Sequence, residues 1–196
     1  MPTWFARVTV GLGPPGFSEN AVLLREQGHA PVKLWAAFDG AYAVHSRVGV
    51  GVWAGLSRGA SRHAGSAYGI YPSGASLNEV GYYVAAQAPV RVWGDRDLAL
   101  ELVPRVGYAA GRLSWNLEAD ESDSPSVSGS SREARRLEAP MQHTAIFGAA
   151  VTLTSYAYHL GLDTGLVFAP VGAPGELGQS HDFGGFYFAF GGTIDG

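Results

Sequence analysis

Residues 80–111 read VGYYVAAQAPVRVWGDRDLALELVPRVGYAAG. Apolar side chains alternate with small, polar or charged ones on both sides of the polar sequence Gly94–Asp97. Alternation with a period of two is typical of a β-strand, and a short polar turn between two such segments is typical of an antiparallel hairpin. The stretch therefore predicts two long neighbouring strands of one antiparallel sheet.

The second face of this hairpin carries Gln87, Arg91, Glu101 and Arg105 among glycines and alanines. In a water-soluble antiparallel sheet, the face opposite the core is normally covered with polar residues. A face that is small and only sporadically charged suits the inside of a narrow barrel instead. The apolar face is then expected to point outward, into lipid.

The composition suits a protein with much of its surface outside water. Charged residues make up 15% of the 196-residue chain, whereas about 25% is usual in soluble domains. The net charge is −4, which gives no reason to expect nucleic-acid binding. Cysteine is absent, which excludes disulfides and thiolate zinc sites. The length suits a single domain, residues 1–196.

The chain shows neither a spanning helix nor a secretory signal. No stretch reaches the roughly 18–20 consecutive apolar residues that a spanning helix needs. The first ten residues lack a basic segment followed by a long apolar run. Because Trp4 already begins an alternating segment, we interpret the chain as a mature exported protein with an added methionine.

Eight alternating segments run through the chain, at residues 4–13, 32–44, 48–57, 80–93, 98–111, 142–155, 160–168 and 183–194. Short connections follow the second, fourth and sixth segments, and long ones follow the first, third, fifth and seventh. In an up-and-down barrel, all the short connections then lie at one end. This asymmetry is typical of transmembrane barrels. The sequence therefore predicts an all-β, eight-stranded antiparallel up-and-down transmembrane β-barrel with short periplasmic turns and four long extracellular loops.

Two prolines fall inside the predicted strands, at Pro89 and Pro104. Each lacks the N–H group with which a strand residue donates a hydrogen bond to the neighbouring strand. A closed barrel has no edge strand on which a residue without this donor leaves every ladder hydrogen bond intact. A bulge or a distorted ladder is expected at these positions.

The chain resembles the small eight-stranded outer-membrane proteins of Gram-negative bacteria, of the OmpX, OmpW and OmpA-barrel type. The residues that carry the resemblance are AFDGAYAVHSRVGVGVWAGLSRG (37–59), ELVPRVGYAAG (101–111) and FYFAF (186–190). The resemblance implies a bacterial outer-membrane location, a monomer, and contact with membrane lipid and lipopolysaccharide. Such barrels usually end with an aromatic residue, whereas this chain continues GGTIDG beyond Phe190. The last strand is therefore expected to be longer than drawn, or the end to be atypical.

The predicted inward face carries charges in a space that an eight-stranded barrel leaves just wide enough for side chains. Buried charges must be paired, because an isolated one costs several kcal/mol. We therefore expect a salt-bridged plug, with Glu101 paired to Arg105 or Arg91. The expected members of this interior polar network are Arg7, Lys33, Asp39, Arg91, Glu101, Arg105, Arg112 and Asp163.

Four functions remain open at this point. The first is a plugged barrel with a structural or surface-interaction role through its extracellular loops. The second is a narrow pore or transporter for small solutes, with an anion preference because five interior cations face three anions. The third is an enzyme that modifies lipid A. The fourth is a soluble lipocalin-like binder, for which the glycine- and alanine-rich face is a poor exterior.

The sequence offers little for catalysis or for metal binding. The six histidines lack metal-site spacing, and the H-x-S-N element of barrel deacylases is absent. Ser180, His181 and Asp182 are consecutive, so strand geometry would point them to opposite faces and prevent a triad. We therefore expect no enzyme activity, no metal and no cofactor.

The second long connection offers positive charge just beyond the predicted strand. Its basic side chains are candidates for contact with lipopolysaccharide phosphates outside the bilayer. They are Arg58, Arg62 and His63.

Overall fold

A computed structural model describes residues 2–13, 32–62, 76–95, 97–117, 135–138, 140–169 and 184–196. Within these ranges the chain forms strands joined by tight turns. No helix in the described part is long and apolar enough to cross a membrane.

The described residues form one antiparallel sheet of ten strands. The strands are β1 (Trp4–Gly13), β2 (Val32–His45), β3 (Val48–Arg62), β4 (Ser76–Gln87), β5 (Val90–Gly94), β6 (Leu98–Leu117), β7 (Arg135–Glu138), β8 (Gln142–Ser155), β9 (Leu160–Phe168) and β10 (Gly185–Asp195). Strands β4 and β5 lie end to end along one side of β6. Strands β7 and β8 lie end to end along its other side. The described strands therefore occupy eight positions around the sheet, and the predicted eight-stranded antiparallel arrangement is confirmed. The predicted long connections lie largely outside the described residues.

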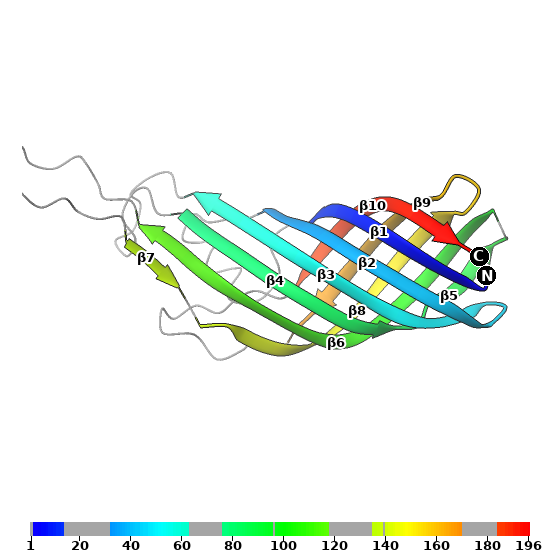
Figure 1. Ribbon diagram of the computed structural model, residues 1–196, viewed down its shortest axis with the longest axis horizontal. Coiled ribbons are helices and arrows are strands. Elements are labelled where there is room, and N and C mark those ends of the chain that lie inside the picture. The colour runs from blue at the N-terminus through cyan, green and yellow to red at the C-terminus, as the bar shows by residue number, and fades with distance from the viewer. Residues whose placement is uncertain are drawn as a thin grey trace, which may run out of the picture.

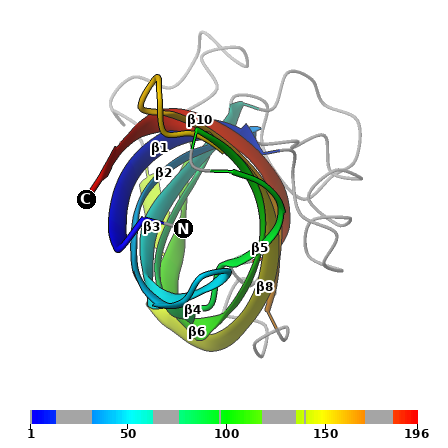
Figure 2. The same ribbon diagram turned by 90° about the vertical axis from the view of Figure 1, so that its right-hand side faces the viewer.

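The sheet closes on itself where the first strand meets the last. β1 pairs with β10 from Phe5↔Asp195 to Leu12↔Phe188, and it pairs with β2 on its other side. The view along the barrel shows the resulting ring of strands (Figure 2). The β2–β3, β5–β6 and β8–β9 connections and both chain termini lie at one end, which we call the turn end (Figure 1). The opposite end is called the far end.

The alternation read from the sequence separates an apolar outside from a tightly packed inside. In β10, Phe186, Phe188 and Phe190 are exposed, whereas Tyr187 and Ala189 are buried. The same pattern runs round the barrel, so that most exposed large side chains on the strands are apolar. An outward apolar face on a closed barrel with no free sheet edge is the arrangement that lipid requires.

Strands β3, β4 and β6 reach further toward the far end than the sequence predicts, and β4 begins at Ser76 rather than Val80. β3 continues to Arg62, which pairs with Ser76, and β6 continues to Leu117, which pairs with β7 at Arg135. The added residues include serine, asparagine and glycine, which favour turns in isolation. Ladder hydrogen bonds with neighbouring strands override that preference here.

Both prolines lie at the break between β4 and β5. Pro89 separates β4 from β5, and its carbonyl accepts from Gly49 N at 2.9 Å. Across the β4–β6 ladder, Pro104 accepts from Ala88 N at 3.2 Å. Since N–H and C=O of one antiparallel residue face the same neighbour, the missing donor of Pro89 faces β3 and the missing donor of Pro104 faces the junction of β4 and β5. The register also shifts between Arg91 and Trp93, which confirms the expected irregularity.

The last strand, β10, extends beyond its aromatic segment, residues 186–190. β10 runs on to Asp195, and Gly196 and Trp4 then exchange two backbone hydrogen bonds of 3.1 Å each. The residues after Phe190 therefore complete the seam with β1, and β10 ends one residue beyond the predicted segment.

Close strand approach at this seam leaves no room for a side chain at Gly191. A Cβ at Gly191 would lie 1.8 Å from the carbonyl oxygen of Val8, whereas a Cβ at Gly192 would meet only His159 O at 3.9 Å. We expect Gly191→Ala to lower the free energy of unfolding by about 1–3 kcal/mol, because the backbone must shift. Gly192→Ala is the control and is expected to be neutral or slightly stabilising. Urea unfolding in detergent, followed by tryptophan fluorescence, compares them; equal losses would contradict the prediction.

Candidate functional site

The lumen contains a buried ion pair between the first two strands. Arg7 and Asp39 face each other across the β1–β2 ladder, and both side chains are almost fully buried. Arg7 Nε donates to Asp39 Oδ2 at 2.9 Å, and Arg7 Nη2 donates to Asp39 Oδ1 at 3.0 Å. The remaining guanidinium nitrogen, Nη1, donates to Thr154 Oγ1 at 2.9 Å. This bidentate geometry is the strongest form of an arginine–carboxylate contact.

A second buried pair is joined to the first through a glutamine. Arg105 Nη2 donates to Asp163 Oδ2 at 3.3 Å. Arg105 Nε donates to Gln87 Oε1 at 3.2 Å, and Gln87 Nε2 donates to Asp39 Oδ1 at 3.5 Å. Tyr187 Oη accepts from Arg105 and donates to Asp163 Oδ2 at 3.1 Å. One connected network therefore links strands on opposite sides of the barrel.

An aromatic cluster packs directly against this network. The rings of Trp35, Trp53, Tyr83 and Tyr187 are all buried, with centroids 4.9–6.5 Å apart. The Arg105 guanidinium lies 4.8 Å from the centroid of the Trp53 ring. These rings come from four different strands, β2, β3, β4 and β10, and pack together inside the barrel.

A further pair lies toward the far end. Lys33 Nζ is 3.6 Å from Glu79 Oε2, and both side chains are buried. Glu79 shares the inward face of its strand with Tyr83 and Gln87. The alternating pattern did not predict Glu79 because the fourth segment was predicted to begin at Val80, whereas β4 begins at Ser76. Glu79 has the same parity as Gln87, which was the available signal.

The turn-end lumen differs from the rest because its charges are not joined in an ion pair. Glu101 is fully buried, and its Oε1 accepts from Tyr156 Oη at 3.3 Å, while Oε2 has no hydrogen-bond partner. Arg105 pairs with Asp163 instead, and Arg91 donates to a backbone carbonyl. The predicted pairing of Glu101 with either arginine is therefore wrong. Burial, with the Glu101 carboxylate beside it, raises the pKa of the Tyr156 phenol and keeps it a hydrogen-bond donor.

The structure places seven of the eight expected interior residues inside the barrel: Arg7, Lys33, Asp39, Arg91, Glu101, Arg105 and Asp163 are all buried. The expectation for Arg112 is wrong. Gly111 faces inward, so Arg112 points outward and is exposed. With Glu79 added, the described interior holds four cations and four anions, which removes the expected excess of positive charge.

Arg112 belongs instead to a row of basic side chains on the outward face near the far end. Arg58 pairs with Val80 across β3–β4, and Val80 pairs with Arg112 across β4–β6. Arg58 is exposed, and it borders an apolar hollow of ≈ 480 Å³ that Leu34, Leu56 and neighbouring outward side chains line. Arg62 ends β3, but its side chain lies outside the described residues, as does the whole of His63.

Metal ligands do not gather in the described part of the chain, where no three His, Cys, Asp or Glu side chains could hold an ion together. Ser180, His181 and Asp182 lie outside the described residues.

Three solved structures resemble this chain over nearly its full length. The attachment invasion locus protein Ail of Yersinia pestis matches 99% of this chain and 100% of its own, at 11% identity and a TM-score of 0.49. Ail with the heparin analogue sucrose octasulfate matches 97% and 99%, at 10% identity and 0.48. Neisserial surface protein A matches 98% and 96%, at 10% identity and 0.49. No family model and no curated protein sequence matches the chain.

The fold of this chain is that of a small outer-membrane β-barrel. The closed ring of eight strand positions, the apolar outward face and the buried charged network inside are features of transmembrane barrels of bacterial outer membranes. A soluble lipocalin-like barrel would not expose a continuous apolar outer face, so the outward face of this barrel excludes that alternative.

Proposed function

We propose that this outer-membrane barrel has a side-chain-plugged lumen and acts without catalysis, in a structural or surface-interaction role. The observation that carries the proposal is the connected network from Thr154 through Arg7, Asp39, Gln87 and Arg105 to Asp163. An ion moving along the axis would have to break these buried bonds and displace the aromatic cluster beside them. Each broken buried pair costs several kcal/mol, so conduction is expected to be negligible.

Planar-bilayer recording tests the plug directly. The refolded chain is expected to give no discrete conductance steps at moderate voltage. Insertion is verified separately by the different gel mobilities of boiled and unboiled protein. A variant that combines Arg105→Ala and Trp53→Ala serves as a positive control, because it removes atoms from both the network and the aromatic cluster. Discrete steps from the unmodified protein would replace the plug with the narrow-pore alternative.

We propose also that the far end contacts phosphate groups of lipopolysaccharide. Arg58 and Arg112 lie on either side of Val80 in one row across three neighbouring strands. Their Cα atoms are therefore about 10 Å apart at the usual strand spacing. Two guanidinium groups at that spacing can bracket one phosphate. The apolar hollow beside Arg58 offers room for an acyl chain of the same lipid. Contact of Arg62 and His63 with the same phosphate groups is likewise part of this proposal.

Thermal unfolding in the presence of lipid tests this contact. Lipopolysaccharide is expected to raise the unfolding temperature of the unmodified protein more than dephosphorylated lipopolysaccharide does. The double variant Arg58→Ala, Arg112→Ala is expected to lose that difference while it keeps its unfolding temperature in neutral detergent. An undiminished difference would mean that the phosphates bind elsewhere.

A further inference from the structure

The outward face carries titratable side chains toward the far end on one side of the barrel. On β3, β4, β6 and β8 of the described chain these exposed side chains are Arg58, Tyr82, Tyr108, Arg112 and His143. At the far ends of β1, β2, β9 and β10 the outward side chains are apolar, as at Leu12, Leu34, Phe168 and Phe186. Because a polar group that faces hydrocarbon is costly, polar parts of lipid molecules are expected to approach the β3–β8 side.

Four of these side chains surround one small residue, Ala110. Across the ladders, Ala110 pairs with Tyr82 of β4 on one side and with His143 of β8 on the other. Tyr108 and Arg112 come two residues before and two residues after Ala110, so they share its outward face. Diagonal neighbours on one face of a sheet are about 7–8 Å apart. Arg112 and His143 are therefore close enough to contact one group that lies over Ala110.

Tyr108 holds the imidazole of His143 in a defined state. Tyr108 Oη is hydrogen-bonded to His143 Nδ1, and the two rings stack with their centroids 5.8 Å apart and their planes at 20°. When the phenol donates to Nδ1, the neutral imidazole carries its proton on Nε2. When the imidazole is charged, Nδ1 donates to the phenol and Nε2 still carries a proton. In both states, Nε2 of His143 is a hydrogen-bond donor.

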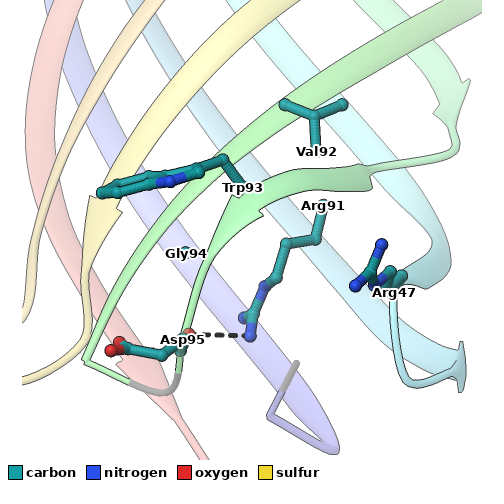
Figure 3. Close-up of a pocket in the computed structure, with 6 residues that line it drawn as sticks. All are labelled: Arg47, Arg91, Val92, Trp93, Gly94 and Asp95. Carbon is teal, nitrogen blue, oxygen red and sulfur yellow. Dashed lines mark hydrogen bonds between the residues drawn. The ribbon is translucent and has the colours of Figure 1, made fainter.

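The turn end carries an arginine and a histidine in a different setting. Arg47 is exposed and lines a hollow of ≈ 440 Å³ (Figure 3), and the exposed His45 lies two residues before it. The other arginine at this hollow, Arg91, donates to the backbone carbonyl of Asp95 at 2.8 Å, and its guanidinium lies 5.8 Å from the centroid of the Tyr156 ring. His45 has Ser46 Oγ, at 3.3 Å, as the partner of its Nδ1. His45 is therefore a matched control for His143.

We propose that His143, positioned by Tyr108, binds a phosphate group of lipopolysaccharide together with Arg112. The inference rests on the proposed contact of Arg58 and Arg112 with lipopolysaccharide, and it adds a residue whose charge changes with pH. A charged donor bonds to a phosphate oxygen about twice as strongly as a neutral donor does. Imidazole groups gain their charge as the pH falls from about 8 to about 5. The contribution of His143 to binding is therefore expected to grow as the pH falls.

The charges around His143 explain why the phosphate matters. On the described strands, Tyr108 and Arg112 of β6 and Tyr82 of β4 are the titratable or charged groups on its side of the barrel. The pairing of β8 with β9 begins further along, at Phe147. Arg112 is the cation among these groups, so it opposes a second positive charge on His143. A bound phosphate removes that opposition, because it favours the charged form of both residues.

The experiment follows phosphate binding by NMR, with the full chain refolded in uncharged maltoside micelles. Lipopolysaccharide is titrated in at a pH of about 5.5 and of about 8, on either side of the usual imidazole range. The His143 Nε2 resonance is expected to shift saturably at the lower pH, and dephosphorylated lipopolysaccharide is expected not to shift it. The backbone amide resonance of Ala110, which every variant keeps, gives the affinity.

Three variants separate charge from structure. His143→Gln keeps an N–H donor without the charge, and it is expected to weaken binding about tenfold at the lower pH and little at the higher pH. Tyr108→Phe keeps the ring but not the hydroxyl, and it is expected to weaken binding several-fold at the lower pH. His45→Gln is expected to leave the affinity unchanged. Phosphate groups lose charge at low pH, which acts in the opposite direction, so each variant is compared with the unmodified protein at the same pH.

Failure of this inference differs from failure of the lipopolysaccharide contact itself. If Arg58→Ala, Arg112→Ala abolishes the effect of the phosphates while His143→Gln binds like the unmodified protein, the arginines act alone and the inference is wrong. Equal losses for His143→Gln at both pH values would also overturn it, because charge would then play no part. If phosphates do not affect the unmodified protein at either pH, the proposed contact is wrong and the role of His143 falls with it.

Discussion

Asp39→Asn is expected to destabilise the barrel by about 3–5 kcal/mol, because the buried Arg7 guanidinium then lacks its counter-charge. Both side chains are at most 1% exposed, and the pair makes two hydrogen bonds of 2.9 and 3.0 Å. Asparagine keeps the size of the side chain, so the loss measures charge and hydrogen bonding rather than a cavity. Urea unfolding of the protein in phospholipid vesicles, followed by tryptophan fluorescence, gives the free energy of unfolding.

Two further variants make the Asp39 result interpretable. Asp97→Asn changes the same residue type at an exposed position of the β5–β6 turn and is expected to change stability by at most about 0.5 kcal/mol. The double variant Arg7→Met, Asp39→Leu removes both charges and is expected to recover most of the loss, since replacing a whole buried pair is often neutral. A loss below about 1 kcal/mol for Asp39→Asn would show that water reaches the pair.

Trp53→Ala is expected to cost about 3–5 kcal/mol, the usual range for removing a large aromatic side chain from a packed interior. Trp53 is 1% exposed, lies between three other buried rings, and has the Arg105 guanidinium over its face. The cavity left behind would also free Arg105 from the contact that helps to hold it against Asp163. Equilibrium unfolding under the same conditions as for Asp39 measures the loss.

Tryptophans elsewhere provide the comparison for Trp53. Trp93→Ala removes an outward ring that is 61% exposed, so the loss is expected to be smaller. Trp53→Phe is expected to lie between the two, because it keeps most of the packing and removes an indole N–H that has no hydrogen-bond partner. Equal losses for Trp53→Ala and Trp93→Ala would mean that the aromatic cluster does not stabilise the lumen.

The barrel could be predicted from sequence because alternation decides which face each residue takes. Strands 4–13 and 142–155 begin and end where the pattern predicts. The extensions of β3 and β6 could not be predicted, because serine, glycine and asparagine carry no apolar period and are held there by neighbouring strands. Strand ends of this kind depend on tertiary pairing rather than on local preference.

The sequence predicts which charged residues lie in the lumen better than it predicts which of them pair with one another. Parity places Arg7, Asp39, Arg105 and Asp163 inside, but it says nothing about height along the barrel axis. Arg105 therefore pairs with Asp163, from a strand far away in sequence, rather than with the nearby Glu101. Tyr156, which donates a hydrogen bond to Glu101, lies in a turn where no alternation exists.

The seam between β1 and β10 has a consequence for the order of assembly. Phe5 pairs with Asp195, so the contact that closes the ring joins residues from the two extremes of the chain. Contacts of such long sequence separation form slowly, because a long loop must be closed before they give any energy in return. Until β10 arrives, β1 and β9 each present an open edge with an apolar side, which is a template for aggregation. A chain that stops before Gly185 is therefore expected to depend on a carrier throughout its lifetime, whereas the finished chain needs one only until the seam forms.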